Sequence, residues 1–296
     1  MPKVDIGIAC SAHQISEWWV PLFGNLLYEE RSGVKIGNIL AMGSALPDIN
    51  KNKVISGGIA PATDKNRNEK TDANRVKIVE KFMEDDADYL FFVDDDTAFP
   101  TGTISQLLAH GRDFIGGLYY NPRSPFNPIA YMRGVNGLYQ PIWDFPFGAV
   151  MQVDSIGMGC TLIHRSVFEK ILAAYTVFQR FNGSIVAVPK NEIRDSRKPR
   201  RGSKTPDQYI TRGYLRTRVT VVDTNDPTEN RPFPFFAMEY GRTEDHHFCE
   251  LCAYVGIAPW VDTSINCDHF KHDGTTRADY KKEFNESISE GRLEPS

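Results

Sequence analysis

Three consecutive carboxylates, Asp94, Asp95 and Asp96, directly follow an apolar run in the segment EDDADYLFFVDDDTAFP. The run 89–93 is bounded by polar residues, which is typical of a central strand that is covered on both faces. Ligands bind at the carboxyl edge of an open α/β sheet, and adjacent carboxylates repel one another without a counter-ion. The segment therefore predicts a site for a cation and a phosphorylated ligand. The alternative is a solvated acidic turn before the helix that follows Pro100.

A second pair of acids opens a helix that the sequence predicts over 244–255. Thr243 is a suitable N-cap, and it places Glu244 and Asp245 in the first turn. Apolar residues on one side anchor this helix, so we expect the two acids to face outward at its amino end. They could simply be partners of the helix dipole, or a rigidly held carboxylate could act as a general base toward a hydroxyl.

Sulfur and imidazole groups crowd the same part of the chain and allow a zinc interpretation. The residues are Cys249, Cys252, Cys267, His246, His247, His269 and His272. Cys252 falls on the apolar face of the predicted helix, and a free cysteine behaves as a small hydrophobic residue. Thiols in the core are therefore favoured over structural zinc, which stays as the alternative of a zinc-stabilised interaction protein.

Five cysteines in 296 residues form an odd and sparse set, which favours reduced thiols in a cytosolic setting. Nothing near Met1 resembles a secretion signal, and no stretch is long and apolar enough to span a bilayer. We therefore expect a cytoplasmic protein, located in the host cytoplasm if the source is viral.

Charge is unevenly distributed along the chain, whose net charge is −4. The segment 186–218 holds ten Lys and Arg against three Asp and Glu, so it is strongly basic. Its central part, RDSRKPRRGSKTPDQ, lacks apolar periodicity and is rich in Pro, Gly and Ser, which predicts an insertion loop. A polyanion such as nucleic acid fits this loop, and the alternatives are a solvated loop or a non-catalytic nucleic-acid-binding module.

Apolar periodicity predicts strands that alternate with helices, and hence an α/β fold with a mostly parallel sheet. The predicted strands cover 4–10, 34–42, 89–93, 114–120, 153–156 and 160–164. The predicted helices cover 17–28, 72–83, 104–110, 167–175 and 244–255. Thr71 or Asp72 is the expected cap of the second helix, and 43–68 is expected to be an extended loop.

Five segments in this order resemble glycosyltransferases of the GT-A type, which are nucleotide-sugar-dependent enzymes with an Asp-x-Asp motif, including the family 2-like enzymes. The segments are NRVKIVEKF, YLFFVDDDTAFP, IGGLYYNPR, VDSIGMGCTLIHRSVFEKI and TEDHHFCELCAYVGIAPWVDTSINCDH. The resemblance covers roughly 4–275 without the basic insertion. It implies a GT-A-like, Rossmann-type sheet flanked by helices.

The resemblance also implies a donor site. Asp94 and Asp96 match the two ends of the Asp-x-Asp motif, which holds a divalent metal and the ribose-diphosphate of the donor, and His269 matches a further metal ligand. Mn²⁺ or Mg²⁺ is expected, because hard cations take oxygen ligands and bridge phosphates. The other donor-side residues that it implies are Arg75, Asp95, Ala9, Cys10 and Ser11. Val76 departs from the usual asparagine, and Asp268 from a frequent glycine.

On the acceptor side, Asp245 matches the catalytic base of inverting members, with Glu244 as its neighbour. Gly157, Met158 and Gly159 resemble a turn of small residues that lets substrates approach the backbone. Arg200 and Arg201 on the basic insertion are expected to hold phosphates of an acceptor.

The sequence thus predicts a single α/β domain that transfers a sugar from a nucleotide diphosphate sugar to an acceptor hydroxyl, with a UDP-sugar as the expected donor. Residues 1–96 are expected to bind the donor and 97–275 to form the acceptor half, with 186–218 as the insertion and 276–296 as a polar tail. The resemblance extends to enzymes that glycosylate hydroxylated bases in bacteriophage DNA, which makes DNA a candidate acceptor.

Overall fold

The computed structural model describes most of the chain. The described residues are 1–9, 16–42, 54–57, 67–121, 125–179, 185–195, 208–212, 215–221, 232–238 and 242–269, together with 282 and 285. The chain forms two compact units: unit 1 comprises Met1–Val167 with Phe236–Ser296, and unit 2 comprises Phe168–Phe235. Among the described residues, no helix combines the length and the apolar character needed to cross a membrane.

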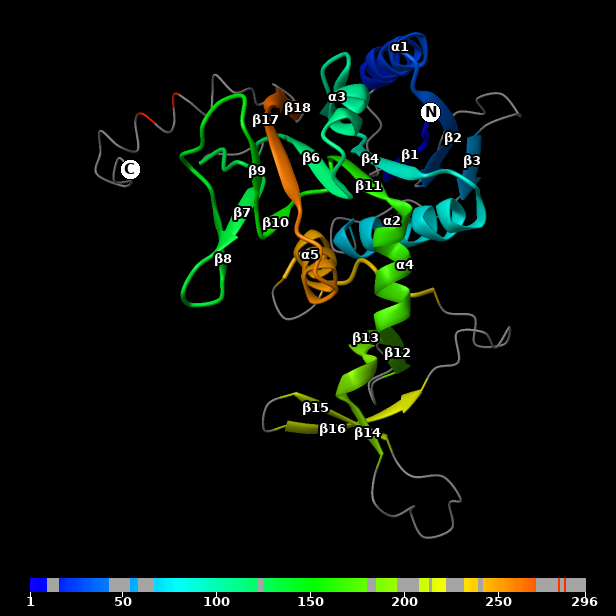
Figure 1. The fold of residues 1–296 in the computed structure, drawn as a ribbon, viewed down its shortest axis with the longest axis vertical. Coiled ribbons are helices and arrows are strands. Elements are labelled where there is room, and N and C mark those ends of the chain that lie inside the picture. Colours follow the sequence, from blue (N-terminus) through cyan, green and yellow to red (C-terminus); the bar gives the residue numbers. More distant parts are fainter. Residues whose placement is uncertain are drawn as a thin grey trace. The chain divides into compact units, whose positions relative to one another are not determined.

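Unit 1 is built on an eight-stranded sheet with the order β3-β2-β1-β4-β11-β6-β17-β9 (Figure 1). Its strands are β1 (Lys3–Ala9), β2 (Lys35–Met42), β3 (Val54–Gly57), β4 (Tyr89–Asp94), β6 (Phe114–Leu118), β9 (Val150–Gln152), β11 (Cys160–His164) and β17 (Trp260–Asn266). Only β11 and β9 run against the other six strands. The predicted α/β class with a mostly parallel central sheet is therefore confirmed.

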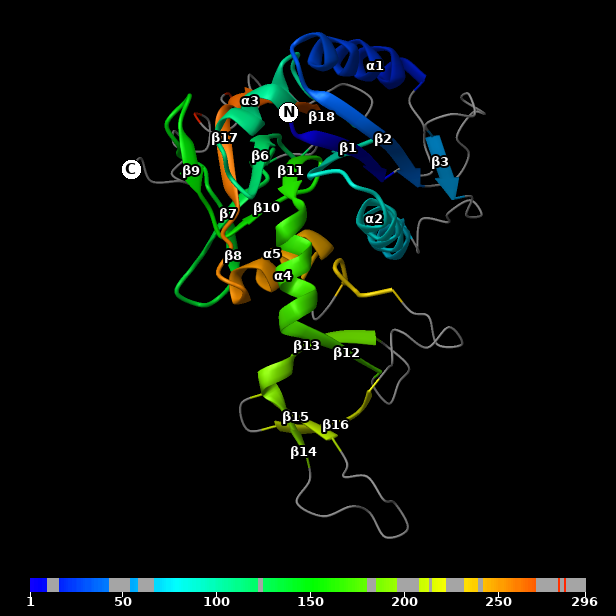
Figure 2. The same ribbon diagram turned by 45° about the vertical axis from the view of Figure 1, so that its right-hand side comes forward.

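Helices cover both faces of this sheet, and Figure 2 shows α1 and α2 on opposite sides of β1, β2 and β3. The helices are α1 (Ser16–Arg31), α2 (Arg67–Glu84), α3 (Thr103–Ala109), α4 (Arg165–Ala174) and α5 (Glu244–Tyr254). Helix α2 begins before the predicted caps Thr71 and Asp72, because Glu69 and Lys70 are good helix formers and extend it. The segment 43–68, expected to be a loop, contains strand β3, where the β-branched residues Val54 and Ile55 favour extended backbone.

The strands β1 and β4 form the centre of the sheet and are buried almost throughout. Gly7 in β1 lets α2 approach closely, because a Cβ atom at this position would lie 2.7 Å from Cγ2 of Ile78. Ile78 is three residues after Arg75, so both lie on the same side of α2. The contact at Gly7 therefore turns Arg75 toward the carboxyl ends of the strands.

Two smaller sheets complete unit 1. One has three strands, β7 (Ala130–Arg133), β8 (Tyr139–Pro141) and β10 (Ser155–Ile156). The other is a ribbon of β5 (Thr97–Ala98) and β18 (Asp268–His269), in which His269 pairs with Thr97. This ribbon joins the end of the described C-terminal region to the residues that follow β4.

Unit 2 contains a five-stranded antiparallel sheet with the order β13-β12-β16-β15-β14. The strands are β12 (Tyr175–Gln179), β13 (Ile185–Pro189), β14 (Ile193–Asp195), β15 (Gln208–Arg212) and β16 (Leu215–Val221), and the short helix η2 (Lys190–Glu192) joins β13 to β14. The basic segment 186–218 is therefore not only a loop. Residues 196–207 lie outside the described part, and the flanking strands follow from alternating apolar residues in ITR and LRTRVTV.

Candidate active site

The strands β1 and β4 end side by side, with Ala9 in register with Asp94. Strand β2 lies on the other side of β1, so the order of the strands reverses between β1 and β4. Such a reversal opens a crevice outside the carboxyl ends of the strands, where ligands bind in open α/β sheets. The predicted residues Ala9 and Asp94 lie at this edge, whereas Cys10 and Ser11 fall outside the described residues.

Arg75 joins three of the predicted carboxylates into one cluster. Its Nη2 atom lies 2.6 Å from Oδ1 of Asp94, and its Nη1 atom lies 2.8 Å from Oε1 of Glu244 and 2.7 Å from Oδ1 of Asp245. The Arg75 side chain is only 3% exposed. The guanidinium therefore binds a sheet end and a helix start at the same time. We refer to Arg75, Asp94, Glu244 and Asp245 as the arginine cluster.

The sequence predicted that the acids of α5 face outward. This prediction is wrong, because both acids bind Arg75. Thr243 is the N-cap of α5 and accepts a hydrogen bond from the backbone N–H of His246. Phe248 anchors the helix from the other side, since it stacks on Phe236 with ring centroids 4.8 Å apart. Because the cap and the aromatic contact fix the helix, its first turn points toward Arg75.

Charge in the arginine cluster is only partly balanced, because one guanidinium faces three carboxylates. Burial would lower the pKa of Arg75, but Asp94, Asp245 and Glu244 raise it well above its ordinary value. Burial raises the pKa of Asp245, and the charges of Glu244 and Asp94 raise it further, against the lowering effect of Arg75. The excess of negative charge favours a positive group or a proton at this edge.

Tyr119 packs over the glycine turn that precedes β11. Its hydroxyl accepts a hydrogen bond from the backbone N–H of Gly159 at 3.0 Å. A Cβ atom at Gly157 would lie 2.0 Å from this hydroxyl oxygen, and one at Gly159 would lie 2.8 Å from Cζ of Tyr119. Gly157, Met158 and Gly159 are all buried. The space that the sequence interpretation reserved for a substrate is therefore filled by Tyr119 in this structure.

The glycine turn also contacts the arginine cluster directly. The backbone N–H of Asp94 donates to the carbonyl oxygen of Gly159 at 3.3 Å, and the backbone N–H of Met158 donates to the carboxylate of Asp245. Burial raises the pKa of Tyr119, and the charges of Asp94 and Asp245 raise it further. The phenol therefore keeps its proton while it accepts the hydrogen bond from Gly159.

Asp96 and His269 meet through the β5–β18 ribbon. Nε2 of His269 lies 3.3 Å from Oδ1 of Asp96, and Nδ1 of His269 lies 2.8 Å from the carbonyl oxygen of Tyr120. A backbone carbonyl can only accept, so Nδ1 carries a proton and Nε2 is directed at Asp96. Burial lowers the pKa of His269, but Asp96 and the carbonyl of Tyr120 raise it above its ordinary value.

This pair is suited to a divalent cation, although the full predicted ligand set is not assembled. Within the described ranges, no group of three or more His, Cys, Asp and Glu is arranged to hold a metal ion. Of the predicted ligands Asp94, Asp96 and His269, the first binds Arg75, with 2.6 Å between Oδ1 of Asp94 and Nη2 of Arg75. Mg²⁺ and similar ions commonly use one or two protein ligands together with phosphates and water, and a histidine fixed by a carbonyl is a typical ligand. Asp96 and His269 therefore fit a phosphate-bridging cation.

The cysteines do not gather into a zinc site in the described part of the chain. Cys249 donates from its thiol to the carbonyl of Ile156, and Cys252 is buried on the apolar side of α5. Cys267 instead forms a hydrogen bond with Cys160 in β11. Burial raises the pKa of Cys249 to about 12, which keeps this thiol protonated. These residues are part of the core, as free buried cysteines commonly are.

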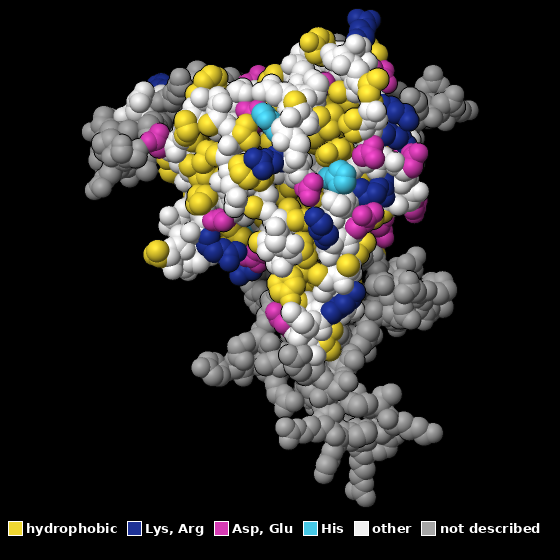
Figure 3. Space-filling view, viewed as in Figure 1, with side chains coloured by type: hydrophobic (Ala, Val, Ile, Leu, Met, Phe, Trp, Pro, Cys, Tyr) yellow, Lys and Arg dark blue, Asp and Glu magenta, His cyan; other side chains and the backbone are white. Residues whose placement is uncertain are grey.

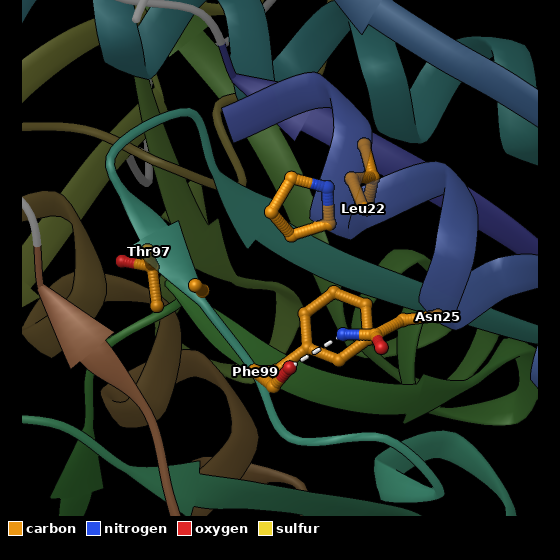
Figure 4. A pocket seen from close by; sticks show the side chains of 6 residues that line it. Leu22, Asn25, Thr97 and Phe99 are labelled. Atoms are coloured by element: carbon orange, nitrogen blue, oxygen red, sulfur yellow. Dashed lines mark hydrogen bonds between the residues drawn. The ribbon is translucent and has the colours of Figure 1, made fainter. Parts of the chain in front are cut away.

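A small pocket lies beside this region, between α1 and β5 (Figure 4). Leu22 and Asn25 come from α1, and Thr97 and Phe99 come from the segment after β4. The amide Nδ2 of Asn25 donates to the carbonyl oxygen of Phe99 at 2.6 Å and ties the two segments together. The pocket has a mostly apolar wall and contains none of the predicted site residues, so we do not assign it a ligand.

Arg200 and Arg201, which were predicted to hold phosphates, lie outside the described residues. Asp95, which was predicted to lie on the donor side, is described and is buried. The sequence patterns did not identify Tyr119, although it lies in the segment IGGLYYNPR. The signal was indirect, because two glycines separated by one residue leave room for a bulky neighbouring side chain without showing which residue supplies it.

No protein-family model matches this chain, and no curated protein matches it. Among solved structures, the chain is similar to the crystal structure of A197 from STIV, with a TM-score of 0.42 and 13% identity over 94% of this chain and 91% of that chain. It is also similar to the crystal structure of GalNAc-T7 with UDP, GalNAc and Mn²⁺, with a TM-score of 0.46 and 8% identity. That match covers 96% of this chain and 48% of the other, so the chain spans about half of that protein.

Proposed function

We propose that this chain is a metal-dependent glycosyltransferase, which moves a sugar from a nucleotide diphosphate sugar such as a UDP-sugar to an acceptor hydroxyl. One observation carries the proposal. Arg75 binds Asp94, Glu244 and Asp245, and these residues come from three of the segments that resemble GT-A enzymes. A cluster built from distant segments at the switch point of an α/β sheet is a typical position for an active site.

Asp96 and His269 would hold Mn²⁺ or Mg²⁺ beside this cluster. When bound, such an ion stabilises the negative charge that develops on the departing nucleotide diphosphate. Ala9, at the end of β1, lies where the nucleotide would pass the sheet edge. In this proposal the donor binds to residues 1–96 and the acceptor to residues 97–275.

Asp245 is the proposed general base. It accepts the proton of the acceptor hydroxyl while the hydroxyl oxygen forms a bond to the anomeric carbon. The bond between the anomeric carbon and the diphosphate oxygen breaks, and the nucleotide diphosphate leaves with the electron pair. Arg75 and the backbone N–H of Met158 hold the Asp245 carboxylate in place, which limits the reorientation needed during the reaction.

The acceptor in this proposal is a nucleic acid. The segment 186–218 carries ten Lys and Arg against three acids, including Arg200 and Arg201, and phosphates are the groups that such a segment binds. By contrast, acidic and basic side chains are interspersed among the described residues that Figure 3 colours. A hydroxylated base in DNA is one acceptor that combines a hydroxyl with phosphates.

The central test is nucleotide-sugar turnover. With a panel of UDP-sugars and Mn²⁺, the protein should release UDP, and Asp96→Ala should lower the rate by about 100-fold or more, the scale of losing one electrostatic stabiliser. Asp86→Ala is the matched control, because it removes an equally charged carboxylate that is 83% exposed. Equal turnover of D96A and D86A would contradict the assigned metal role.

The general base can be tested separately from donor binding. Asp245→Asn should lower kcat by about 10²- to 10⁴-fold, and the UDP-sugar should still raise the melting temperature, because the donor does not need the base. Glu250→Gln on the same helix is the control, since Glu250 binds the surface residues Arg133 and Arg242 instead. A D245N variant that turns over like E250Q would remove Asp245 from the mechanism.

A further inference from the structure

One face of the three-stranded sheet β10-β7-β8 packs against helix α5. Tyr131 of β7 is in register with Ser155 of β10. Arg133, two positions further along β7, is in register with Tyr139 of β8. Residues that lie opposite one another, or two positions apart on a strand, share a face of the sheet. This face meets His246 of α5, since Oγ of Ser155 lies 2.7 Å from its Nδ1 and the ring of Tyr139 stacks on it with centroids 4.2 Å apart.

The charged groups on this face bind one another. The Nη2 atom of Arg133 donates to the hydroxyl of Tyr139 at 2.7 Å and to Oε1 of Glu250 at 2.9 Å. Arg242 pairs with the other oxygen of Glu250. The backbone N–H of Arg133 donates to Oδ2 of Asp154 at 2.7 Å. The two arginines are therefore matched by two carboxylates.

Uncharged aromatic groups lie next to the proposed general base. The ring of Tyr131 contacts that of His246 edge-on, with centroids 4.8 Å apart, and His246 directly follows Asp245 in the first turn of α5. Burial lowers the pKa of His246 to about 4, and the charges of Arg242 and Arg133 lower it further. The imidazole is therefore neutral at pH 7, as is the phenol beside it.

The hydroxyl group of Tyr131 makes no hydrogen bond to any other residue that the structure describes, and the side chain is only half-buried. Burial raises the pKa of Tyr131 to about 12, and the charge of Asp245 raises it further, so the carboxylate is close enough to act on the phenol. The phenol keeps its proton and can donate a hydrogen bond beside the proposed base.

The arginine cluster disfavours charged parts of an acceptor at this position. Three carboxylates surround the single guanidinium of Arg75, so the cluster is negative when they are ionised. A phosphate beside Asp245 would add to this excess of negative charge, whereas an uncharged group would not.

We infer that Tyr131 is a specificity-determining residue for the acceptor, and that the part of the acceptor beside Asp245 is an uncharged ring carrying the reacting hydroxyl. The Tyr131 hydroxyl donates a hydrogen bond to an oxygen or nitrogen atom of this ring, and His246 holds the phenol in place through the edge-on contact. Phosphates of the acceptor stay outside this position. The inference rests on the proposed function, in which Asp245 is the general base.

Acceptor kinetics with a UDP-sugar and Mn²⁺ test the hydroxyl, and the probe is a single-stranded oligonucleotide with one hydroxymethylated pyrimidine. Tyr131→Phe keeps the ring and should raise KM for the oligonucleotide about 5- to 10-fold, the scale of one lost hydrogen bond, while KM for the UDP-sugar stays within about 2-fold. Tyr254→Phe is the matched control, because it removes a hydroxyl at the other end of α5, where the side chain is 43% exposed. It should change neither KM.

Three small acceptors test the charge and identify the ring. They are a hydroxymethylated pyrimidine nucleoside, methyl glucoside, and glucose 6-phosphate. At least one of the two uncharged rings should accept sugar about 10-fold faster than glucose 6-phosphate, and the opposite order would overturn the inference. Preference for the nucleoside supports a nucleic-acid acceptor, whereas preference for methyl glucoside supports the role of Tyr131 with a saccharide in place of the nucleic acid.

Binding without turnover separates this inference from the proposed function. With UDP and Mg²⁺ present, the nucleoside or methyl glucoside should shift the ring ¹⁵N signal of His246, which is recognised among the seven histidines by its loss in His246→Gln. Half of the shift should need about 5- to 10-fold more ligand in Y131F. A shift without UDP release from any UDP-sugar would contradict sugar transfer and leave Tyr131 as a ligand-binding residue. An unshifted His246 signal, or equal acceptor KM of Y131F and Y254F, would overturn the inference itself.

Discussion

Strand β1 has a group of carboxylates near each end, and the two groups are neutralised differently. At the carboxyl end, the arginine cluster holds Asp94, Glu244 and Asp245 around one buried guanidinium. Toward the amino end, Asp5 is buried and accepts a hydrogen bond from the backbone N–H of Asn38 at 2.7 Å. Lys3, the cation at this end, binds Asp85 and Asp86.

Because of this difference, the charge at the two ends of β1 responds differently to pH. Burial raises the pKa of Asp5 to about 6, and the neighbouring charge of Asp85 contributes to the shift, while the hydrogen bond from Asn38 opposes it. Below about pH 6, a proton therefore neutralises Asp5 at the amino end of β1. A guanidinium stays charged at any working pH, so the positive charge in the arginine cluster is constant. A fixed positive charge keeps several carboxylates together at one point.

Removing the guanidinium should give the largest effect. Arg75→Met leaves carboxylates of the arginine cluster buried without a cation, which should lower the free energy of unfolding by about 3–5 kcal/mol at pH 7. Urea denaturation measures this loss. The loss should shrink at low pH, where the carboxylates are protonated and no longer need the cation.

Arg242→Met is the matched control for this prediction. Arg242 pairs with Glu250, but its side chain is 50% exposed, and an exposed ion pair contributes less than about 1 kcal/mol. If both variants lost the same small amount, the carboxylates around Arg75 would not carry the charge that the comparison requires.

At the other end of β1, removal of a charge should stabilise the protein. The pKa of Asp5 is higher in the folded state than its ordinary value, so its contribution to stability is present below about pH 4 and is lost as the pH rises through 6. Asp5→Asn should therefore raise the free energy of unfolding by about 2 kcal/mol at pH 7, and the gain should fall toward zero below pH 4.

The control for this prediction is Asp86→Asn. Asp86 also belongs to the carboxylates near the amino end of β1, but its side chain is exposed. It should change stability by less than about 1 kcal/mol at either pH. A D5N variant that is destabilised equally at pH 4 and pH 7 would mean that the carboxylate of Asp5 is bound by neighbours in its charged form.

Sequence patterns predicted the positions of the main elements around the site because those elements have strong local signals. The run before Asp94 is apolar at every position, and Thr243 followed by acids is a clear helix start. The α/β class and the mostly parallel sheet followed from the alternation of such elements. The basic segment was harder, because its length and its Pro and Gly content concealed the short alternating strands β15 and β16.

The contacts within the site could not be predicted from those signals. Arg75 meets Glu244 and Asp245 across 169 and 170 residues of sequence, so the contact depends on how closely α2 packs on β1 at Gly7. The direction of the α5 acids depends on the stacking of Phe248 on Phe236, and the position of Tyr119 depends on its contact with Gly157 and Gly159. Local periodicity contains no information about such distances, whereas resemblance to a family placed the residues in one site without giving their partners.

The smallest expected effect concerns how the site end of β1 is held together. Tyr119→Phe removes the acceptor of the Gly159 N–H, and this buried donor without a partner should lower the free energy of unfolding by about 1 kcal/mol. Amide hydrogen exchange at Gly159 should become faster, which a general loss of packing would not confine to this residue. Tyr28→Phe, at a side chain that is 48% exposed, is the control and should change neither quantity. Because Tyr119 also packs on His269 with ring centroids 5.6 Å apart, unchanged exchange at Gly159 and unchanged stability would show that the ring contact, and not the hydroxyl, fixes the glycine turn.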